Sequence, residues 1–332
     1  VKPDFWLMGE VIHGDYSRWV NGETLHSVTN YALHKALYSG HNDHNYFEIA
    51  HTVKYLQNMG NLDLYNFVDN HDVERIYTKL SNKAHFTPVH ILLYTLPGVP
   101  SIYYGSEFGI EGRKERSSDD SLRPALSLDD YETALGDNPC TALIAALGQI
   151  RQHTPALSYG SYAELHLTNR QFAFARDLND VRVVVTVNND DNAASMDLPA
   201  GNAVEYIGAL SGQKVAVQDG RINVTVPANS GEIWVPSGDM PEYKPFKVEI
   251  SVKEETVTDE ESIPADSEAP SSATEPVHFD PNKSPEDMSV AELQAAILAK
   301  MANNGPVSDQ MKKTVNENIW HDSLVNWLKS FR

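Results

Sequence analysis

Two acidic side chains stand directly after short apolar stretches of the chain. Glu10 closes the segment FWLMGE, and Asp72 follows the segment LYNFVDNH. Each carboxylate taken alone has an ordinary explanation, as a cap at a strand end or as a loop residue. A pair says more, because hydrolysis of a glycosidic bond uses one carboxylic acid to protonate the leaving oxygen and a second carboxylate across the sugar ring. The two residues together therefore predict acid/base chemistry on a sugar.

The segments that must position these carboxylates alternate between apolar runs and helix-like patterns up to about residue 155. The apolar runs have the length and the β-branched or aromatic content of buried parallel strands. We predict strands over residues 5–10, 27–32, 64–70 and 100–105, and helices over residues 46–59, 86–96 and 141–153. Asn45 followed by Glu48 predicts a capped start for the first helix. This alternation indicates a parallel sheet, at whose carboxyl edge catalytic side chains gather.

From about residue 160 to residue 237 the apolar period changes to two. Strand-like runs separated by Asn, Asp, Gly and Pro predict a small antiparallel β-sandwich. Residues 238–292 then hold 15 acidic and 4 basic side chains. Because such a composition cannot bury enough apolar surface to fold, we expect residues 238–284 to form a disordered linker.

The end of the chain is predicted to be helical again. Ser289 and Glu292 form a capping box before the run VAELQAAILAKMA, and a second amphipathic run covers roughly residues 308–330. The apolar faces of these two helices leave two alternatives open, docking on the sandwich and binding of another protein.

Composition excludes several classes of protein. A formal net charge of −20 argues against nucleic acid and anionic membranes as partners. Cys140 is the single cysteine, so no internal disulfide forms; this fits a reducing compartment and favours a cytoplasmic location. No apolar run approaches the roughly 20 residues that span a bilayer, and VKPDFWLMGE is not built like a signal peptide. The first residue is not Met, and we expect sequence to precede it.

Three segments carry a family resemblance in both order and spacing. They are GEVIH at 9–13, NFVDNHD at 66–72, and PGVPSIYYGSEFGIEG at 97–112 followed by Arg123-Pro124. They resemble the later signature segments of the α-amylase family, glycoside hydrolase family 13, and most closely its neopullulanase and cyclomaltodextrinase branch.

The resemblance implies an α/β plus all-β architecture that covers the carboxyl-terminal portion of such an enzyme. The expected parts are the second half of a TIM-type (β/α)8 barrel, strands five to eight, then the antiparallel sandwich, the acidic linker and the two terminal helices. The boundaries that we predict are 1–155 for the partial barrel, 156–237 for the sandwich, 238–284 for the linker and 285–332 for the helical tail.

The resemblance also implies roles for individual side chains. Glu10 would be the general acid/base, and Asp72 would grip sugar hydroxyls and favour the oxocarbenium-like transition state. His71 would donate a hydrogen bond beside Asp72, with a histidine satisfied inside a loop as the alternative. The other positions assigned to substrate binding are His13, Asn70 and Arg75, with a supporting ion pair as the alternative for Arg75. Tyr103 and Tyr104 either pack in the barrel or stack on a sugar.

One expected part of the family pattern is absent. The nucleophilic aspartate of the family lies in a G-x-R-x-D segment upstream of the acid, and only nine residues precede Glu10. Retaining hydrolysis requires that nucleophile about 5 Å from the acid. We therefore expect the isolated chain to be inactive and marginally folded or prone to aggregate. We expect no cofactor and no metal, because the histidines around residues 41–51 match no zinc spacing.

The sequence thus predicts a fragment of a retaining glycosidase acting on α-glucans such as maltodextrin, starch or cyclodextrin. Its partners would be the glucan and the missing amino-terminal half of the barrel. The alternative is a noncatalytic carbohydrate-binding or protein-interaction module. The choice between α-1,4 and α-1,6 bonds, the balance of hydrolysis and transglycosylation, and the oligomeric state stay open.

Overall fold

The computed structural model describes residues 5–237, 283–285, 288–303 and 328. The chain divides into two compact units, Val1–Glu255 and Thr256–Arg332. The linker predicted over 238–284 and the second tail helix predicted over 308–330 lie almost entirely outside the described residues.

Four short parallel strands form the first part of the chain. They are β1 (Met8–Gly9), β2 (Ser27–Val28), β3 (Tyr65–Asn66) and β4 (Val99–Pro100). β1 pairs with β2 and β3 pairs with β4, both in parallel, and a parallel bridge between Thr29 and Tyr65 joins the two pairs. The predicted parallel arrangement is confirmed, but the strands are shorter than predicted.

The strand predicted over 27–32 ends early because a helix begins there. Asn30 is the N-cap residue, and its side chain accepts a hydrogen bond from Leu33 N at 3.1 Å. The helix that follows, α1 (Tyr31–Asn42), was not predicted. Its buried residues Leu33, Ala36 and Leu37 have helical spacing, but the β-branched run before them masked the change of period.

The helices predicted between the strands are present. They are α2 (Tyr46–Gln57), α4 (Phe86–Thr95) and α6 (Pro139–His153). Asn45 is the N-cap residue of α2, as predicted, but its side chain makes no capping hydrogen bond. Glu48 bonds to Lys35 on α1 instead of turning back to the helix start, so tertiary pairing replaces the local capping box. The shorter helices are α3 (Ile76–Lys79), α5 (Ala134–Asp137), α7 (Pro155–Tyr159) and five 3-10 turns, Tyr16–Arg18, Lys83–His85, Ser106–Phe108, Asp120–Leu122 and Leu128–Tyr131.

An antiparallel β-structure follows, as the period of two predicted. A six-stranded sheet has the order β10-β9-β12-β7-β6-β5, and β11 pairs with β8 in a second, two-stranded sheet. The strands are β5 (Ser161–Leu167), β6 (Gln171–Leu178), β7 (Val181–Asn188), β8 (Ala194–Pro199), β9 (Glu205–Gly208), β10 (Lys214–Ala216), β11 (Arg221–Val226) and β12 (Ser230–Pro236). β5 and β8 were not predicted.

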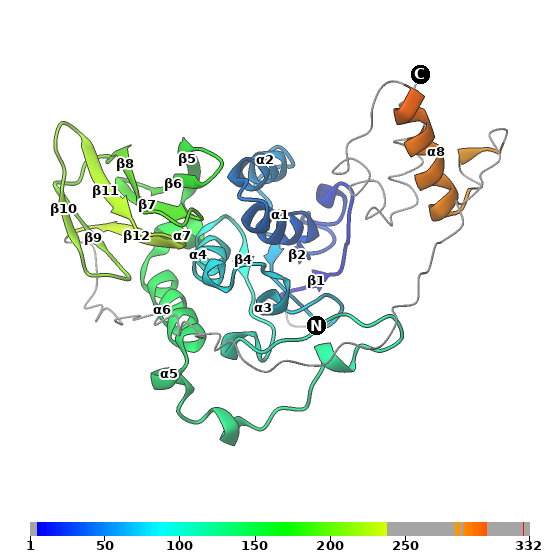
Figure 1. Ribbon diagram of the computed structural model, residues 1–332. Coiled ribbons are helices and arrows are strands. Elements are labelled where there is room, and N and C mark those ends of the chain that lie inside the picture. Colours follow the sequence, from blue (N-terminus) through cyan, green and yellow to red (C-terminus); the bar gives the residue numbers. More distant parts are fainter. Residues whose placement is uncertain (1–4, 238–282, 286–287, 304–327, 329–332) are drawn as a thin grey trace, which may run out of the picture. The chain divides into compact units, whose positions relative to one another are not determined.

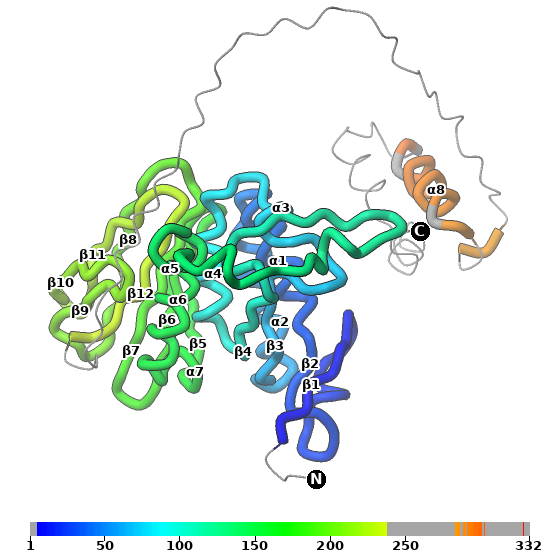
Figure 2. The backbone as a smooth tube through the Cα atoms, turned by 90° about the horizontal axis from the view of Figure 1, so that it is seen from below, coloured from blue at the N-terminus to red at the C-terminus, as the bar shows by residue number. Residues whose placement is uncertain are grey.

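Both faces of the six-stranded sheet are buried. One face packs with the β8–β11 pair around Trp234, Tyr206 and Leu198. The other face packs on α4 and α7, where Phe172, Phe174 and their neighbours join the core of the α/β part (Figure 1). The two parts of the first unit therefore share one apolar core. β1 and β2 lie on the side of the α/β part away from this sheet (Figure 2).

The four parallel strands do not close into a barrel. In the described residues β1 pairs only with β2, and β4 only with β3. The side chains of Phe5, Trp6, Leu7 and Met8 are between 40% and 60% exposed. An apolar strand with both faces buried is the rule for a parallel sheet. This part of the chain is thus a partial α/β domain with an open edge.

In the second unit the structure describes one helix, α8 (Val290–Asn303). The capping box predicted before it is present. Ser289 N donates to Glu292 Oε2 at 2.7 Å, and Glu292 N donates back to Ser289 Oγ at 3.3 Å. Local sequence alone specified this helix start.

Candidate active site

Glu10 and the loop that holds Asp72 lie at the same edge of the parallel sheet. Glu10 follows β1 directly, and residues 67–75 lead away from β3. Because these strands run parallel, their carboxyl ends meet at one edge. The sheet therefore brings together two side chains that are 62 positions apart in the chain.

Tyr31 connects Glu10 with this loop. Its hydroxyl donates a hydrogen bond to Glu10 Oε1 at 3.1 Å and accepts one from Asn70 Nδ2 at 3.0 Å. Tyr31 is the first residue of α1 and comes three positions after the last residue of β2, the strand between β1 and β3. A side chain at that point can reach both neighbouring strand ends.

Asn70 organises the turn that presents Asp72. Its Oδ1 accepts hydrogen bonds from Asp72 N at 2.9 Å and from Val73 N at 3.1 Å, while its Nδ2 donates to Tyr31. An asparagine side chain that accepts from backbone amides two and three positions later forms an Asx turn. Most of the hydrogen-bonding capacity of Asn70 is thus used inside the protein.

Asp72 is half-exposed and paired with a cation. Arg123 donates to Asp72 Oδ1 at 2.8 Å and to the carbonyl oxygen of His71 at 3.1 Å, and it also reaches Asp119 at 3.2 Å. His71 Nε2 lies 3.4 Å from the other oxygen, Asp72 Oδ2. Both oxygens of this carboxylate therefore have a nitrogen neighbour, while the histidine ring remains exposed.

Arg75 lies beneath this surface and is fully buried. Its guanidinium donates to the carbonyl oxygens of Tyr104 and Leu122 and to Ser106 Oγ, and it lies 4.3 Å from the centre of the Tyr103 ring. A side chain held in this way has no face open to a substrate. Arg75 therefore supports the loop from below, through carbonyl and hydroxyl acceptors rather than through the ion pair that was the stated alternative.

Asp69 completes this buried group. It accepts hydrogen bonds from Ile76 N at 2.7 Å and from Ser106 Oγ at 2.8 Å, and Ser106 in turn accepts from Arg75. Burial raises the pKa of Asp69 to about 6, although its hydrogen bonds and the nearby guanidinium work in the opposite direction. The network fixes the base of the loop that carries Asn70, His71 and Asp72.

The remaining predicted residues lie on exposed loops or at the end of the last strand. His13 is exposed on the loop after β1. Tyr104 donates from its hydroxyl to the carbonyl oxygen of Pro124 at 2.9 Å, and its ring meets that of Tyr103 edge-on at 4.7 Å. The ring of Tyr103 lies between Arg75 and His71, whose ring centre is 6.5 Å away. Both rings thus have packing partners, while Tyr104 remains 43% exposed, and the choice between packing and sugar stacking stays a prediction.

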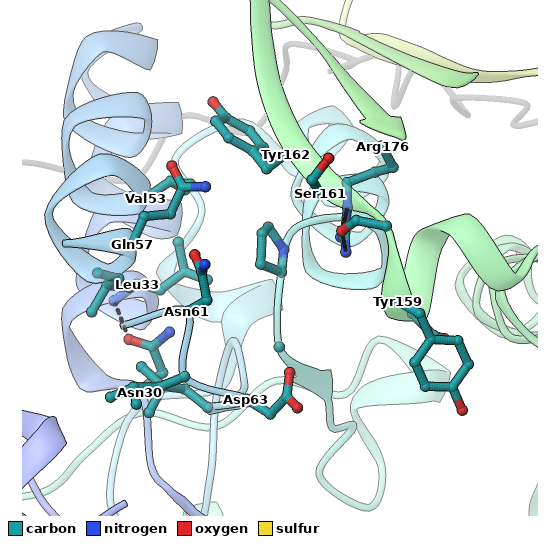
Figure 3. Close-up of a pocket in the computed structure, with 17 residues that line it drawn as sticks. Asn30, Leu33, Val53, Gln57, Asn61, Asp63, Tyr159, Ser161, Tyr162 and Arg176 are labelled. Carbon is teal, nitrogen blue, oxygen red and sulfur yellow. Dashed lines mark hydrogen bonds between the residues drawn. The ribbon is translucent and has the colours of Figure 1, made fainter. Parts of the chain in front are cut away.

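A cavity of about 430 Å³ lies elsewhere in the same unit. Its lining includes Asn61, Asp63 and Gly98, which precede β3 and β4, together with Tyr162 and Arg176 from the six-stranded sheet (Figure 3). Asn61, Asp63 and Gly98 stand before the amino ends of β3 and β4, whereas Asn30, which also lines the cavity, follows β2. Glu10 and Asp72 do not line this cavity.

No group of three or more His, Cys, Asp or Glu side chains in the described part of the chain could hold a metal ion. Among the helices of these same residues, none has both the length and the apolarity that crossing a membrane requires.

Sequence reasoning missed three members of this site. Tyr31 lies inside the strand predicted over 27–32, and its place near the end of that strand was the one available signal. Arg123 stood in a recognised segment, but its pairing with Asp72 joins residues 51 positions apart. Asp69 was read as part of an apolar run, whereas a buried carboxylate needs partners that only the tertiary fold supplies.

Comparison with protein families gives two matches. Residues 1–159 match the model of the alpha amylase catalytic domain, and residues 160–234 match that of the alpha-amylase C-terminal domain.

Among characterised proteins, the chain is similar to neopullulanase 2 of Thermoactinomyces vulgaris. They are 25% identical over 244 residues, which cover 70% of this chain and 40% of that protein. It is also similar to a cyclomaltodextrinase of Thermoanaerobacter pseudethanolicus, 28% identical over 195 residues, which cover 57% of this chain and 33% of the relative. The chain spans less than half the length of these relatives.

Solved structures show the same fold. An Anoxybacillus alpha-amylase superposes with a TM-score of 0.61 at 22% identity, covering 71% of this chain and 53% of that one. The alpha-amylase of Geobacillus thermoleovorans, solved in complex with acarbose, gives a TM-score of 0.60 at 20% identity, with coverage of 70% and 53%.

Proposed function

Because this chain belongs to the α-amylase family, glycoside hydrolase family 13, we propose that it is part of a retaining α-glucan hydrolase. In this proposal it carries the general acid/base, Glu10, and the transition-state carboxylate, Asp72. The observation that supports this most directly is the hydrogen-bonded path from Glu10 through Tyr31 and Asn70 to the backbone of Asp72. A noncatalytic module has no need to hold two carboxylates in a fixed relation at one sheet edge.

The proposed roles follow from this arrangement. Glu10, exposed at the strand end, donates its proton to the glycosidic oxygen as the bond to the sugar breaks, and later accepts a proton from the attacking water. Asp72, held by Arg123, binds sugar hydroxyls and favours the oxocarbenium-like transition state, with His71 beside it. His13 contacts the same sugar, and Asn70 acts through the loop rather than as a free substrate ligand.

The nucleophile has to come from outside these 332 residues. The nine residues before Glu10 contain no G-x-R-x-D segment, and the other acidic groups do not replace a missing nucleophile. We propose that the chain represents strands five to eight of the (β/α)8 barrel and that the first half of the barrel supplies this aspartate. Residues 1–332 alone are then inactive.

The proposed substrates are α-glucans: maltodextrin, starch or cyclodextrin. Neopullulanase and cyclomaltodextrinase are among the relatives by name, which supports this class. A cytoplasmic location is part of the proposal and depends on the single cysteine and on the branch that the sequence resembles.

The central test replaces Glu10 in the protein encoded by the complete reading frame that contains residues 1–332, called the full-length protein below. Glu10→Gln keeps the shape of the side chain but removes the acid. We expect kcat on maltodextrin to fall by about 10²- to 10⁴-fold, as measured by release of reducing sugar. Glu164→Gln, at an exposed residue of β5, is the matched control and leaves kcat unchanged.

Near-normal turnover of Glu10→Gln would remove this residue from the mechanism and favour the noncatalytic alternative. Hydrolysis of maltodextrin by residues 1–332 alone would contradict the proposed need for an external nucleophile.

A further inference from the structure

We propose that Tyr31 is a positioning residue for Glu10. Its hydroxyl holds the carboxyl group of Glu10 in the orientation that delivers the proton, and it couples this group to the Asp72 loop through Asn70. This inference rests on the proposed role of Glu10 and adds a residue that sets the geometry between the two carboxylates.

The position of Tyr31 in the sheet makes this connection possible. Glu10 follows β1 and Asn70 follows β3, and Tyr31 follows the strand between them. Its hydroxyl reaches Glu10 Oε1 at 3.1 Å on one side and Asn70 Nδ2 at 3.0 Å on the other. Glu10 is exposed, and in the described part of the chain the one side-chain hydrogen bond to its carboxylate comes from Tyr31.

Tyr31 is itself held in place. Its ring packs edge-on against Phe67, with 4.9 Å between the ring centres and an angle of 80° between the planes. His34 lies edge-on to it at 6.1 Å, and Asn30 fixes the first turn of α1 by capping Leu33 N. A donor attached to a packed ring and a capped helix start has little freedom to move, as precise orientation of a catalytic group requires.

The hydroxyl of Tyr31 is a constant donor. Burial raises its pKa above the ordinary value for tyrosine, so it keeps its proton throughout the neutral range. It uses that proton on Glu10 and one lone pair on Asn70, which leaves a single acceptor site. Little capacity remains for a sugar, and this favours positioning over substrate binding.

The test compares two substrates of the full-length protein. Hydrolysis of maltodextrin needs a proton on the leaving oxygen, whereas α-maltosyl fluoride expels fluoride with little need for an acid. kcat/KM reports the steps up to departure of the leaving group. For Tyr31→Phe we expect kcat/KM on maltodextrin to fall about tenfold to a hundredfold, in line with loss of a hydrogen bond to a charged group. On the fluoride we expect a change of less than about threefold.

Two further variants make the result decisive. In Glu10→Gln, kcat/KM on maltodextrin must also fall more than kcat/KM on the fluoride, and the difference must be larger than in Tyr31→Phe. Tyr38→Phe removes a hydroxyl two turns along α1, roughly 10 Å from Tyr31, and leaves both substrates unaffected. Thermal unfolding confirms that each variant is folded.

If Tyr31→Phe lowers kcat/KM equally on both substrates, or on neither, while Glu10→Gln shows the contrast, the role of Tyr31 is refuted and that of Glu10 stands. If Glu10→Gln itself shows no contrast, the proposed function fails and the inference about Tyr31 fails with it.

Discussion

At the scale of single residues, this site separates groups that face a substrate from groups that support them. Glu10, His71 and His13 are exposed, whereas Arg75 and Asp69 are fully buried a short distance away. The buried guanidinium contacts two carbonyl oxygens, one hydroxyl and two aromatic rings. Its planar fork matches this set of acceptors, which a lysine ammonium cannot reproduce.

Arg75→Lys in the full-length protein should therefore lower stability more than substrate affinity. We expect the free energy of unfolding in urea to fall by roughly 3 kcal/mol, because buried acceptors lose their donors. Arg113→Lys is the matched control, since Arg113 is exposed and 3.7 Å from Glu74; its effect should stay below about 0.5 kcal/mol. Unchanged stability with a tenfold higher KM would instead identify Arg75 as a substrate ligand.

At the scale of elements, the helices of the α/β part carry buried histidines. Burial lowers the pKa of His34 and of His41, both on α1, to about 3 and that of His90 on α4 to about 4. These rings are neutral in the folded state and take up protons on unfolding below pH 6.5. Their contribution to stability is therefore present above pH 6.5 and lost as the pH falls. Burial raises the pKa of two carboxyl groups, Asp69 and Glu232, and these act in the opposite sense.

Lowering the pH from 7.5 to 5 should thus destabilise the protein. Each of the three histidines accounts for about 2 kcal/mol at pH 5, and Asp69 offsets about 1 kcal/mol. His90→Leu should remove about 2 kcal/mol of this pH dependence, measured by urea unfolding at both pH values. Phe86→Leu disturbs the ring contact with His90, at 3.8 Å, without removing a titrating group. Phe86→Leu should lower the free energy of unfolding equally at both pH values. If that free energy changed between pH 7.5 and pH 5 by the same amount in His90→Leu as in the parent protein, the role of His90 in the pH dependence would be contradicted.

At the scale of the whole molecule, the first unit has a well-filled core on one side and an uncovered strand on the other. The six-stranded sheet is buried on both faces, while the apolar side chains of β1 and its preceding residues remain exposed. Uncovered strand edges with apolar side chains promote association between chains.

Residues 1–332 expressed alone should accordingly self-associate and bind an apolar dye. Leu7→Lys, which places a charge on the exposed segment before β1, should raise the fraction of monomer in light scattering after gel filtration. Val204→Lys, at a side chain that is 81% exposed in the C-terminal β-structure, should not. A monomeric parent chain without dye binding would show that the open edge has no such effect.

The sequence by itself determined the features that depend on near neighbours in the chain. Alternation of strands and helices, the change to a period of two near residue 160 and the capping box at Ser289 all follow from spacings of two to four residues, and the structure confirms them. The position of Glu10 after an apolar strand is also a feature that depends on near neighbours in the chain. The unpredicted α1 marks the limit, where a β-branched run gave way to a helix within a few residues.

The tertiary structure alone decided which distant side chains meet. The bonds of Tyr31 with Glu10 and Asn70 join residues 21 and 39 positions apart, and Arg123 reaches Asp72 across 51. Such contacts depend on the order of strands in the sheet, which no local pattern encodes. The same holds for the burial of Arg75, because a charge can be buried only where the fold brings acceptors around it.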